Sequence, residues 1–367
     1  MPASTGEMTR PTWVNEKDGD NMIIRNGAFA LSFLAMAAHA SAEGTLAPYG
    51  IADVSVRHAD DATPANRSIL DDGQFYASRI GVTGSEDLQP DLKAVMVLEA
   101  GFDPSTGNAT PAPTATASYG QAATTGSRLF GRQSYVGLAS TRFGALTFGR
   151  QFTLAHIVSG EFQPNTNPNS APLAVLPGWQ GARQDNMVKY LNDVGPLSLG
   201  ASYAFSEGAN GKAYGLSAGY KFAPVEILAY GQRMDNNATA TDHRKILGAG
   251  FDVALPAGFK AYGGYMKRTQ TASTVQNNIL LAALTWSATP KLVLTASGTL
   301  DHESAFATTH AGSRKVYFVE AEYHFTHTTS LYAELDRNQV EGGYALPAFM
   351  LAKGTQDGGA IGLEYRF

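Results

Sequence analysis

The sequence contains no cysteine, which excludes disulfide bonds, a thiol nucleophile and any metal site built on thiolates. Charged residues make up only 16% of the chain, below the roughly 25% that is usual. The formal net charge of −5 provides no basic excess to neutralise phosphates, so we expect no nucleic-acid partner. By contrast, the chain has 39 glycines, 16 tyrosines and 18 phenylalanines, a composition that suits a β-rich envelope protein.

Long apolar runs are also missing. After residue 43 no stretch of 18 apolar residues occurs, so this part of the sequence predicts no membrane-spanning helix. If it lies in a membrane, it has to form a closed barrel, because lipid offers no hydrogen-bond partners to an open sheet edge.

The N-terminal region predicts export. Residues 22–42 have a basic residue, Arg25, near their start, continue with an uncharged apolar stretch at 28–38 and end in an Ala-Ser-Ala site, the pattern of a signal peptide. The apolar stretch is too short for a transmembrane helix, which needs about 20 residues. We therefore expect the mature chain to begin at Glu43. Residues 1–21 have no such pattern and are interpreted as a non-native extension from a misassigned start.

From Tyr49 onward, apolar and polar residues alternate in segments of about ten residues that are separated by turn residues, as in barrel strands. Helical periodicity is nearly absent. The final segment is the clearest, with one face apolar and the other polar: Ile361, Leu363, Tyr365 and Phe367 against Gly362, Glu364 and Arg366. Alternation alone does not distinguish a membrane barrel from a soluble β-sandwich.

Connection lengths favour the barrel. Tight turns, as at 223–224 and 289–290, alternate with long loops at 103–127, 152–182 and 341–357. Short turns at one rim and long loops at the other are typical of outer-membrane barrels, and the strand number is even. The sixteen expected strands are 47–57, 74–87, 92–102, 128–140, 143–151, 183–192, 196–206, 212–222, 225–235, 245–254, 259–270, 277–288, 291–301, 314–325, 329–340 and 358–367.

Three strands end in the tripeptide Tyr-x-Phe, at 220–222, 323–325 and 365–367. In this strand order all three lie at the rim with the short turns. Alternation directs both rings of each tripeptide outward and the residue between them inward. The sequence therefore predicts an aromatic girdle at the boundary between lipid and water.

Five segments and a terminal phenylalanine resemble the trimeric general porins of β-proteobacteria over essentially all of residues 43–367. The segments are Tyr49–Asp53 at the start of the first strand, Ser78–Leu88, Phe130–Leu138, Phe143–Gln151 and Arg183–Tyr190. The resemblance implies an all-β, transmembrane, 16-stranded antiparallel up-and-down barrel whose third long loop, residues 152–182, folds into the lumen. It also implies a homotrimer in the Gram-negative outer membrane.

The same resemblance implies a passive diffusion channel for small hydrophilic solutes and ions. The barrel would contact outer-membrane lipid and lipopolysaccharide, and the barrel-assembly machinery would recognise Phe367. Family porins pass solutes between arginines of the wall and acidic groups of the inward loop. By motif, Arg79, Arg132 and Arg183 match the wall arginines.

The acidic side of the expected constriction is Glu161 on the third loop, together with Asp53 on the wall. Strand parity places Arg79 and Arg183 on polar faces, and it is less clear for Arg132, which shares a face with apolar residues. Because three arginines would face one or two carboxylates, we expect a weak preference for anions. Arg150 also matches a family position, but shares its face with apolar residues and is assigned a structural role.

Catalytic patterns are weak. Residues 215–219 fit G-x-S-x-G but lie within a predicted strand, without the strand-to-helix elbow that a serine nucleophile needs. His324 and His327 lack a third ligand at metal spacing, and no phosphate-binding glycine loop occurs. We expect no enzymatic activity, metal or cofactor. Two other classes remain open: a barrel that acts as an adhesin or receptor through its long loops, and a secreted β-sandwich that binds a ligand.

Overall fold

The computed structural model describes residues 44–60, 67–110, 128–175, 181–207, 211–236, 242–271, 275–304 and 311–367. No helix within these ranges is long and apolar enough to cross a membrane. The predicted signal peptide at 22–42, the extension before it and part of the loop at 103–127 lie outside the described residues.

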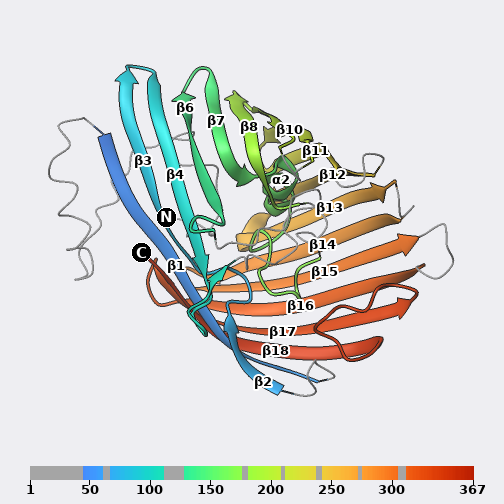
Figure 1. The fold of residues 1–367 in the computed structure, drawn as a ribbon. Coiled ribbons are helices and arrows are strands. Elements are labelled where there is room, and N and C mark those ends of the chain that lie inside the picture. Colours follow the sequence, from blue (N-terminus) through green and yellow to red (C-terminus); the bar gives the residue numbers. More distant parts are fainter. Residues whose placement is uncertain are drawn as a thin grey trace.

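The strands form one antiparallel sheet that closes on itself, because the first strand pairs with the last (Figure 1). This confirms the predicted 16-stranded up-and-down barrel. β2 and β3 both pair with β1 as two parts of one barrel strand, and β5 is a two-residue bridge beside β4. The strands are β1 Gly44–Ala59, β2 Arg67–Asp72, β3 Arg79–Gln89, β4 Leu92–Phe102, β5 Ala109–Thr110, β6 Gln133–Ser140, β7 Gly144–Phe152, β8 Arg183–Val194, β9 Leu197–Ala204, β10 Ala213–Phe222, β11 Val225–Asp235, β12 His243–Ala254, β13 Phe259–Gln270, β14 Gln276–Thr289, β15 Leu292–Ser304, β16 Gly312–His324, β17 Thr329–Gly342 and β18 Gly354–Arg366.

Burial in the barrel is inverted relative to a soluble protein. Along β17, Leu335 is 66% exposed, whereas its neighbours Glu334 and Asp336 are 2% and 5% exposed. The same division holds along β18, where Ile361 and Leu363 face outward and Glu364 is buried. A soluble sandwich would bury the apolar face instead. The apolar side chains therefore form an outer surface suited to hydrocarbon, and the polar ones line the interior.

We predict that Leu335→Arg destabilises the barrel in a bilayer by about 2–4 kcal/mol, because Leu335 lies mid-strand on the outward face and would place a charge in hydrocarbon. The midpoint of urea unfolding in lipid vesicles measures this effect. Leu335→Phe is the control and should unfold near the wild-type midpoint. An unchanged midpoint for Leu335→Arg would contradict a lipid-facing position.

The two rims differ as predicted. Strands meet in tight connections at 223–224 and 290–291, and the Tyr-x-Phe tripeptides lie at this rim. In each tripeptide the two rings contact one another, with centroids 6.1 Å apart at 220–222, 5.2 Å at 323–325 and 6.0 Å at 365–367. All six rings are exposed at this rim, as an aromatic girdle requires.

The predicted strand at 74–87 is wrong at its start. β2 ends at Asp72, β3 begins at Arg79, and residues 73–78 leave the sheet opposite only two residues of β1. This inward segment is stabilised by Phe75, whose ring lies 5.7 Å from that of Phe318 and 5.4 Å from that of Tyr332 inside the barrel. The expected strand at 128–140 likewise begins later, at Gln133.

The third loop folds into the barrel as predicted, and part of it is helical. α2, Leu154–Glu161, begins at Thr153, whose hydroxyl accepts a hydrogen bond from the His156 amide at 3.2 Å. The helix lies inside the barrel beside β10–β12 (Figure 1). At its C-terminal end Phe162 is fully buried over Gly250 and Gly264, where a Cβ atom would lie 2.3 Å and 2.6 Å from its ring. The absence of side chains at these glycines fixes where the loop docks.

Candidate functional site

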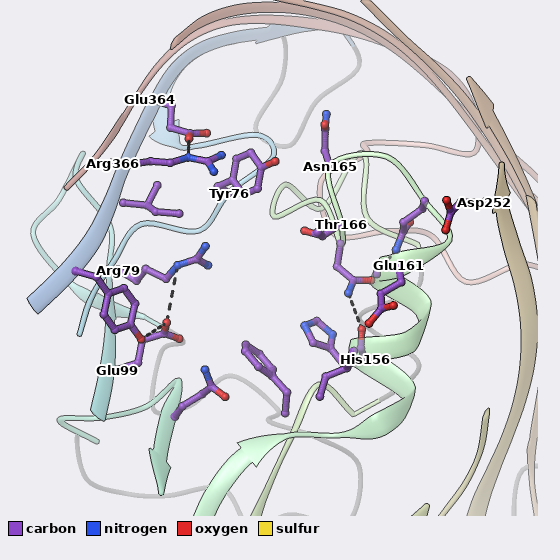
Figure 2. A pocket seen from close by; sticks show the side chains of 18 of the residues that line it. Tyr76, Arg79, Glu99, His156, Glu161, Asn165, Thr166, Asp252, Glu364 and Arg366 are labelled. Atoms are coloured by element: carbon purple, nitrogen blue, oxygen red, sulfur yellow. Dashed lines mark hydrogen bonds and ion pairs between the residues drawn. The ribbon is translucent and has the colours of Figure 1, made fainter. Parts of the chain in front are cut away.

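A cavity of about 990 Å³ lies in the lumen between the third loop and the opposite wall. Figure 2 shows Arg79 and Arg366 projecting into it from the wall, and His156, Asn165 and Thr166 from the loop. The lining continues to the short-turn rim, where it includes Pro290 and residues 325–329. The loop and the wall therefore border a polar passage inside the barrel.

Glu99 on β4 organises one wall of this passage. Its carboxylate accepts a hydrogen bond from Arg132 Nε at 2.7 Å and from the Tyr49 hydroxyl at 2.9 Å, and lies 3.9 Å from Arg79 Nε. Both arginines and Glu99 are buried. Since a single carboxylate pairs with two guanidinium groups, this cluster has a net positive charge.

A second pair lies beside it at the end of β18. Arg366 donates to Glu364 on the same strand, and its guanidinium carbon lies 4.6 Å from the centre of the Tyr76 ring. Tyr76 belongs to the inward segment at 73–78. The interruption of the second strand thus supplies an aromatic surface that holds a third arginine at the passage (Figure 2).

Arg183 lies deeper than the lining. Its guanidinium carbon is 4.6 Å from the centre of the Phe152 ring, which stacks on His156 with centroids 4.7 Å apart. The Arg132 guanidinium carbon lies 5.9 Å from the same ring. Phe152 and His156 are among the residues that line the cavity, whereas these two arginines contact the lining.

Burial lowers the pKa of His156 well below its ordinary value of 6.5, and the positive charges of Arg183, Arg132 and Lys189 lower it further. The imidazole is therefore neutral at physiological pH. Its Nδ1 atom is buried and forms no hydrogen bond with any residue that the structure describes.

This predicts a pH effect on folding. Because the unfolded chain protonates His156 near pH 6.5 and the folded barrel does not, the free energy of unfolding falls as the pH drops below 6.5, by up to about 1.4 kcal/mol per pH unit. Urea unfolding of the wild type and of His156→Gln at pH 8 and pH 5 measures this contribution. The wild type should lose more stability than the variant, and equal losses would contradict a neutral buried imidazole.

The loop side of the passage is mostly uncharged. Gln163 donates to Asn167 at 2.7 Å, Asn167 donates to the His156 carbonyl at 2.9 Å, and Asn165 donates to Glu320. Glu161, the carboxylate predicted on this loop, also lines the cavity, as does Asp252 of β12 (Figure 2). The arginines are therefore balanced chiefly by carboxylates of their own wall.

Asp53 is fully buried and is not part of the cavity lining. It accepts hydrogen bonds from the Tyr332 hydroxyl at 2.9 Å and from the Tyr76 amide at 3.3 Å. Its contacts hold the inward segment at 73–78 against the wall. The structure thus brings Arg79 and Glu161 to the passage and places Arg132, Arg183 and Asp53 behind its surface.

Sequence reasoning missed Glu99 and His156 as lining residues. Glu99 lies on the same face of β4 as Val95 and Val97, so the sequence pattern makes this face look apolar. All three residues are nevertheless buried on the inner side of the barrel. Arg366 and Glu364 had been placed on the polar face of the last strand, but not at the constriction. Strand parity applied to every charged residue would have found Arg366 but not Glu99, whose face carries two valines.

Comparisons with known proteins agree with this geometry. The family model of the Gram-negative porins matches residues 27–343. An outer membrane porin protein of Bordetella pertussis is 30% identical over 184 residues, which span 46% of this chain and 44% of that protein. The chain therefore aligns with less than half the length of this relative.

Two solved structures share the fold. The anion-selective porin from Comamonas acidovorans has a TM-score of 0.74 at 19% identity, with 89% of this chain and 100% of that chain covered. The trimer form of OmpT from Vibrio cholerae has a TM-score of 0.65 at 18% identity, with 88% and 99% covered.

Proposed function

Because the chain belongs to the family of Gram-negative porins, proteins of the outer membrane, we propose that it is a passive diffusion channel for small hydrophilic solutes and ions. The observation that supports this most directly is the inverted barrel, whose polar interior holds a cavity of about 990 Å³. A water-filled lumen of this kind needs neither a catalytic group nor a cofactor.

We further propose a weak preference for anions. Arg79 and Arg132 share a single carboxylate, that of Glu99, so this part of the wall has a net positive charge, and mainly neutral side chains face it. The whole lining is nearly balanced, with six Lys and Arg against seven Asp and Glu, so the preference depends on the narrow part. The similar fold of the Comamonas porin, described as anion-selective, is in line with this proposal.

Single-channel recording of the refolded mature chain in a planar bilayer tests both proposals. We expect discrete conductance steps and, under a gradient of potassium chloride, a reversal potential displaced weakly toward that of chloride. A barrel that inserts without conductance would contradict the channel. Clear cation selectivity would contradict only the anion preference.

Assembly and export complete the proposal. A homotrimer is supported by the trimer form of OmpT from Vibrio cholerae. Recognition of Phe367 by the barrel-assembly machinery, contact with lipopolysaccharide and removal of residues 22–42 as a signal peptide remain predictions from the sequence. Cross-linking of the refolded protein measures the number of chains, and N-terminal sequencing of the exported protein identifies the cleavage site.

A further inference from the structure

Arg314 joins two long loops inside the mouth of the barrel. It lies near the start of β16, at the rim with the long loops, and is 7% exposed. One of the two is the third loop, of which we name residues 169–175 the return arm. The other is the last loop, residues 343–353, which connects β17 to β18. Neither Arg314 nor the last loop lines the passage.

The guanidinium group of Arg314 binds the backbone of the return arm. Its Nη2 atom donates to the carbonyl oxygens of Ala171 and Pro172, both at 2.9 Å, and its Nη1 atom donates to that of Ala174 at 3.4 Å. On the barrel wall, Nε donates to Asn338 at 3.1 Å. A planar group with several donors in a fixed fork can bind wall and loop at the same time, which the single ammonium group of a lysine cannot do in one geometry.

The return arm is packed as well as hydrogen-bonded. Leu173 is 4% exposed and lies in a buried cluster with the aromatic rings of the inward segment at 73–78. The Ala174 amide donates to the Ser170 carbonyl at 2.8 Å and closes a turn in the arm. Just before this turn the loop carries residues 165–167, which line the passage opposite the wall arginines (Figure 2). The carbonyl groups that Arg314 binds therefore belong to the segment that places this side of the passage.

The last loop contacts the same guanidinium group through Phe349. The centre of the Phe349 ring lies 5.1 Å from the guanidinium carbon of Arg314, within the range of a cation–π contact. The loop is fixed to the barrel independently of this contact. The Tyr344 hydroxyl donates to Asp301 on β15 at 2.6 Å, and Gln356 on β18 donates to the Phe349 carbonyl at 3.2 Å. Phe349 is thus a fixed support for the guanidinium group.

We propose that Arg314 is a positioning residue for the third loop, and that the last loop holds it in place through Phe349. This inference rests on the proposed channel function, because the position of the third loop sets the width of the passage. In outer-membrane barrels the long loops are extracellular. A loop at the outer surface therefore controls a passage that it does not line.

Single-channel recording of Phe349→Ala and Arg314→Gln tests the proposal. Loss of the ring should raise the occupancy of conductance levels above that of the wild type about fivefold, the equivalent of about 1 kcal/mol for a cation–π contact. Loss of the guanidinium group should raise it by at least about tenfold, because hydrogen bonds from a charged donor are lost as well. The double variant should match Arg314→Gln alone, since Phe349 then has no guanidinium group to hold.

Two further variants serve as controls. Phe349→Tyr keeps the aromatic face and should conduct as the wild type does. Leu346→Ala removes a side chain of the same loop that is 42% exposed, and it should leave all conductance levels unchanged. Heat-modifiable mobility on gels shows which variants are folded. Wild-type conductance of a folded Phe349→Ala barrel, or additive effects in the double variant, would overturn the proposal.

Hydrogen exchange provides a readout that does not depend on conduction. Peptides that cover residues 169–175, measured by mass spectrometry, should lose protection in Phe349→Ala and in Arg314→Gln, because the turn closed by the Ala174 amide is released. Unchanged exchange in both folded variants would contradict the positioning role whether or not the barrel conducts. A wild-type barrel that inserts but does not conduct would instead contradict the channel function alone.

Discussion

Replacement of Glu99 by glutamine should raise the ratio of anion to cation permeability about fivefold, which corresponds to about 1 kcal/mol for a unit charge at 4 Å in a water-like environment. The reason is that Glu99 is the carboxylate shared by Arg132, at 2.7 Å, and Arg79, at 3.9 Å. Its loss leaves both guanidinium charges without their carboxylate, beside the passage that Arg79 lines. Reversal potentials under a salt gradient measure the ratio, and the effect should shrink at high salt because of screening.

Arg79→Gln is the matched variant of opposite sign. Arg79 lines the passage, so its removal should shift the reversal potential toward cations, and the double variant with Glu99→Gln should return near the wild type. A shift of both single variants in the same direction would contradict the assignment of selectivity to this cluster.

Replacement of Phe162 by alanine should loosen the third loop and increase single-channel conductance, with frequent transitions between conductance levels. The ring is fully buried over Gly250 and Gly264, and loss of a buried phenylalanine costs about 3–5 kcal/mol. This side chain anchors the end of α2, so the helix loses its fixed position against β12 and β13. Planar-bilayer recordings measure both the mean conductance and the noise.

Gly250→Ala approaches the same contact from the barrel wall. The added methyl group would lie 2.3 Å from the Phe162 ring and would displace it, so this variant should also conduct more than the wild type. Phe162→Leu, which keeps an apolar side chain in the slot, is the control and should change conductance less. Unaltered conductance in both Phe162→Ala and Gly250→Ala would show that the loop is held elsewhere.

Strand parity predicted most of the fold because side chains alternate between the two faces of a strand. Once the turns are placed correctly, this alternation alone assigns each residue to the inner or the outer face. It failed where the backbone departs from that period. Residues 74–78 read as the start of a strand because Phe75 and Tyr76 are good strand residues, yet the six residues 73–78 lie opposite only two residues of β1. Gly73, directly before the predicted strand, was the available indication, since a glycine often marks an irregularity in a sheet.

Irregularities also explain the limits of the site prediction. Gly149 has a φ of 136°, and the register of β7 with β8 shifts next to it. Because of this shift, Arg150 Nη1 lies 2.6 Å from the Asp185 carboxylate. This ion pair agrees with the structural role expected for Arg150. On β8, Asn186 has a φ of 53°, which interrupts the alternation of inward and outward side chains. The face assigned to Arg183 from its odd position is therefore not the face of Lys189, which lies beyond the interruption. Arg183 and Phe152 are cross-strand partners on β8 and β7. The stacking of Phe152 on His156, by contrast, depends on the folded third loop, which no strand pattern encodes.

The alternation along β17 has a consequence for the chain before it folds. Leu331, Ala333 and Leu335 are separated by Tyr332, Glu334 and Asp336, so the same residues coiled as a helix would carry acidic groups around much of its circumference. Such a segment has little tendency to stop in a bilayer during secretion, because charged groups oppose insertion of a helix. Its affinity for hydrocarbon arises only when neighbouring strands pair and gather every second side chain onto one surface. The polypeptide can thus cross the inner membrane and still become an integral protein of the outer one.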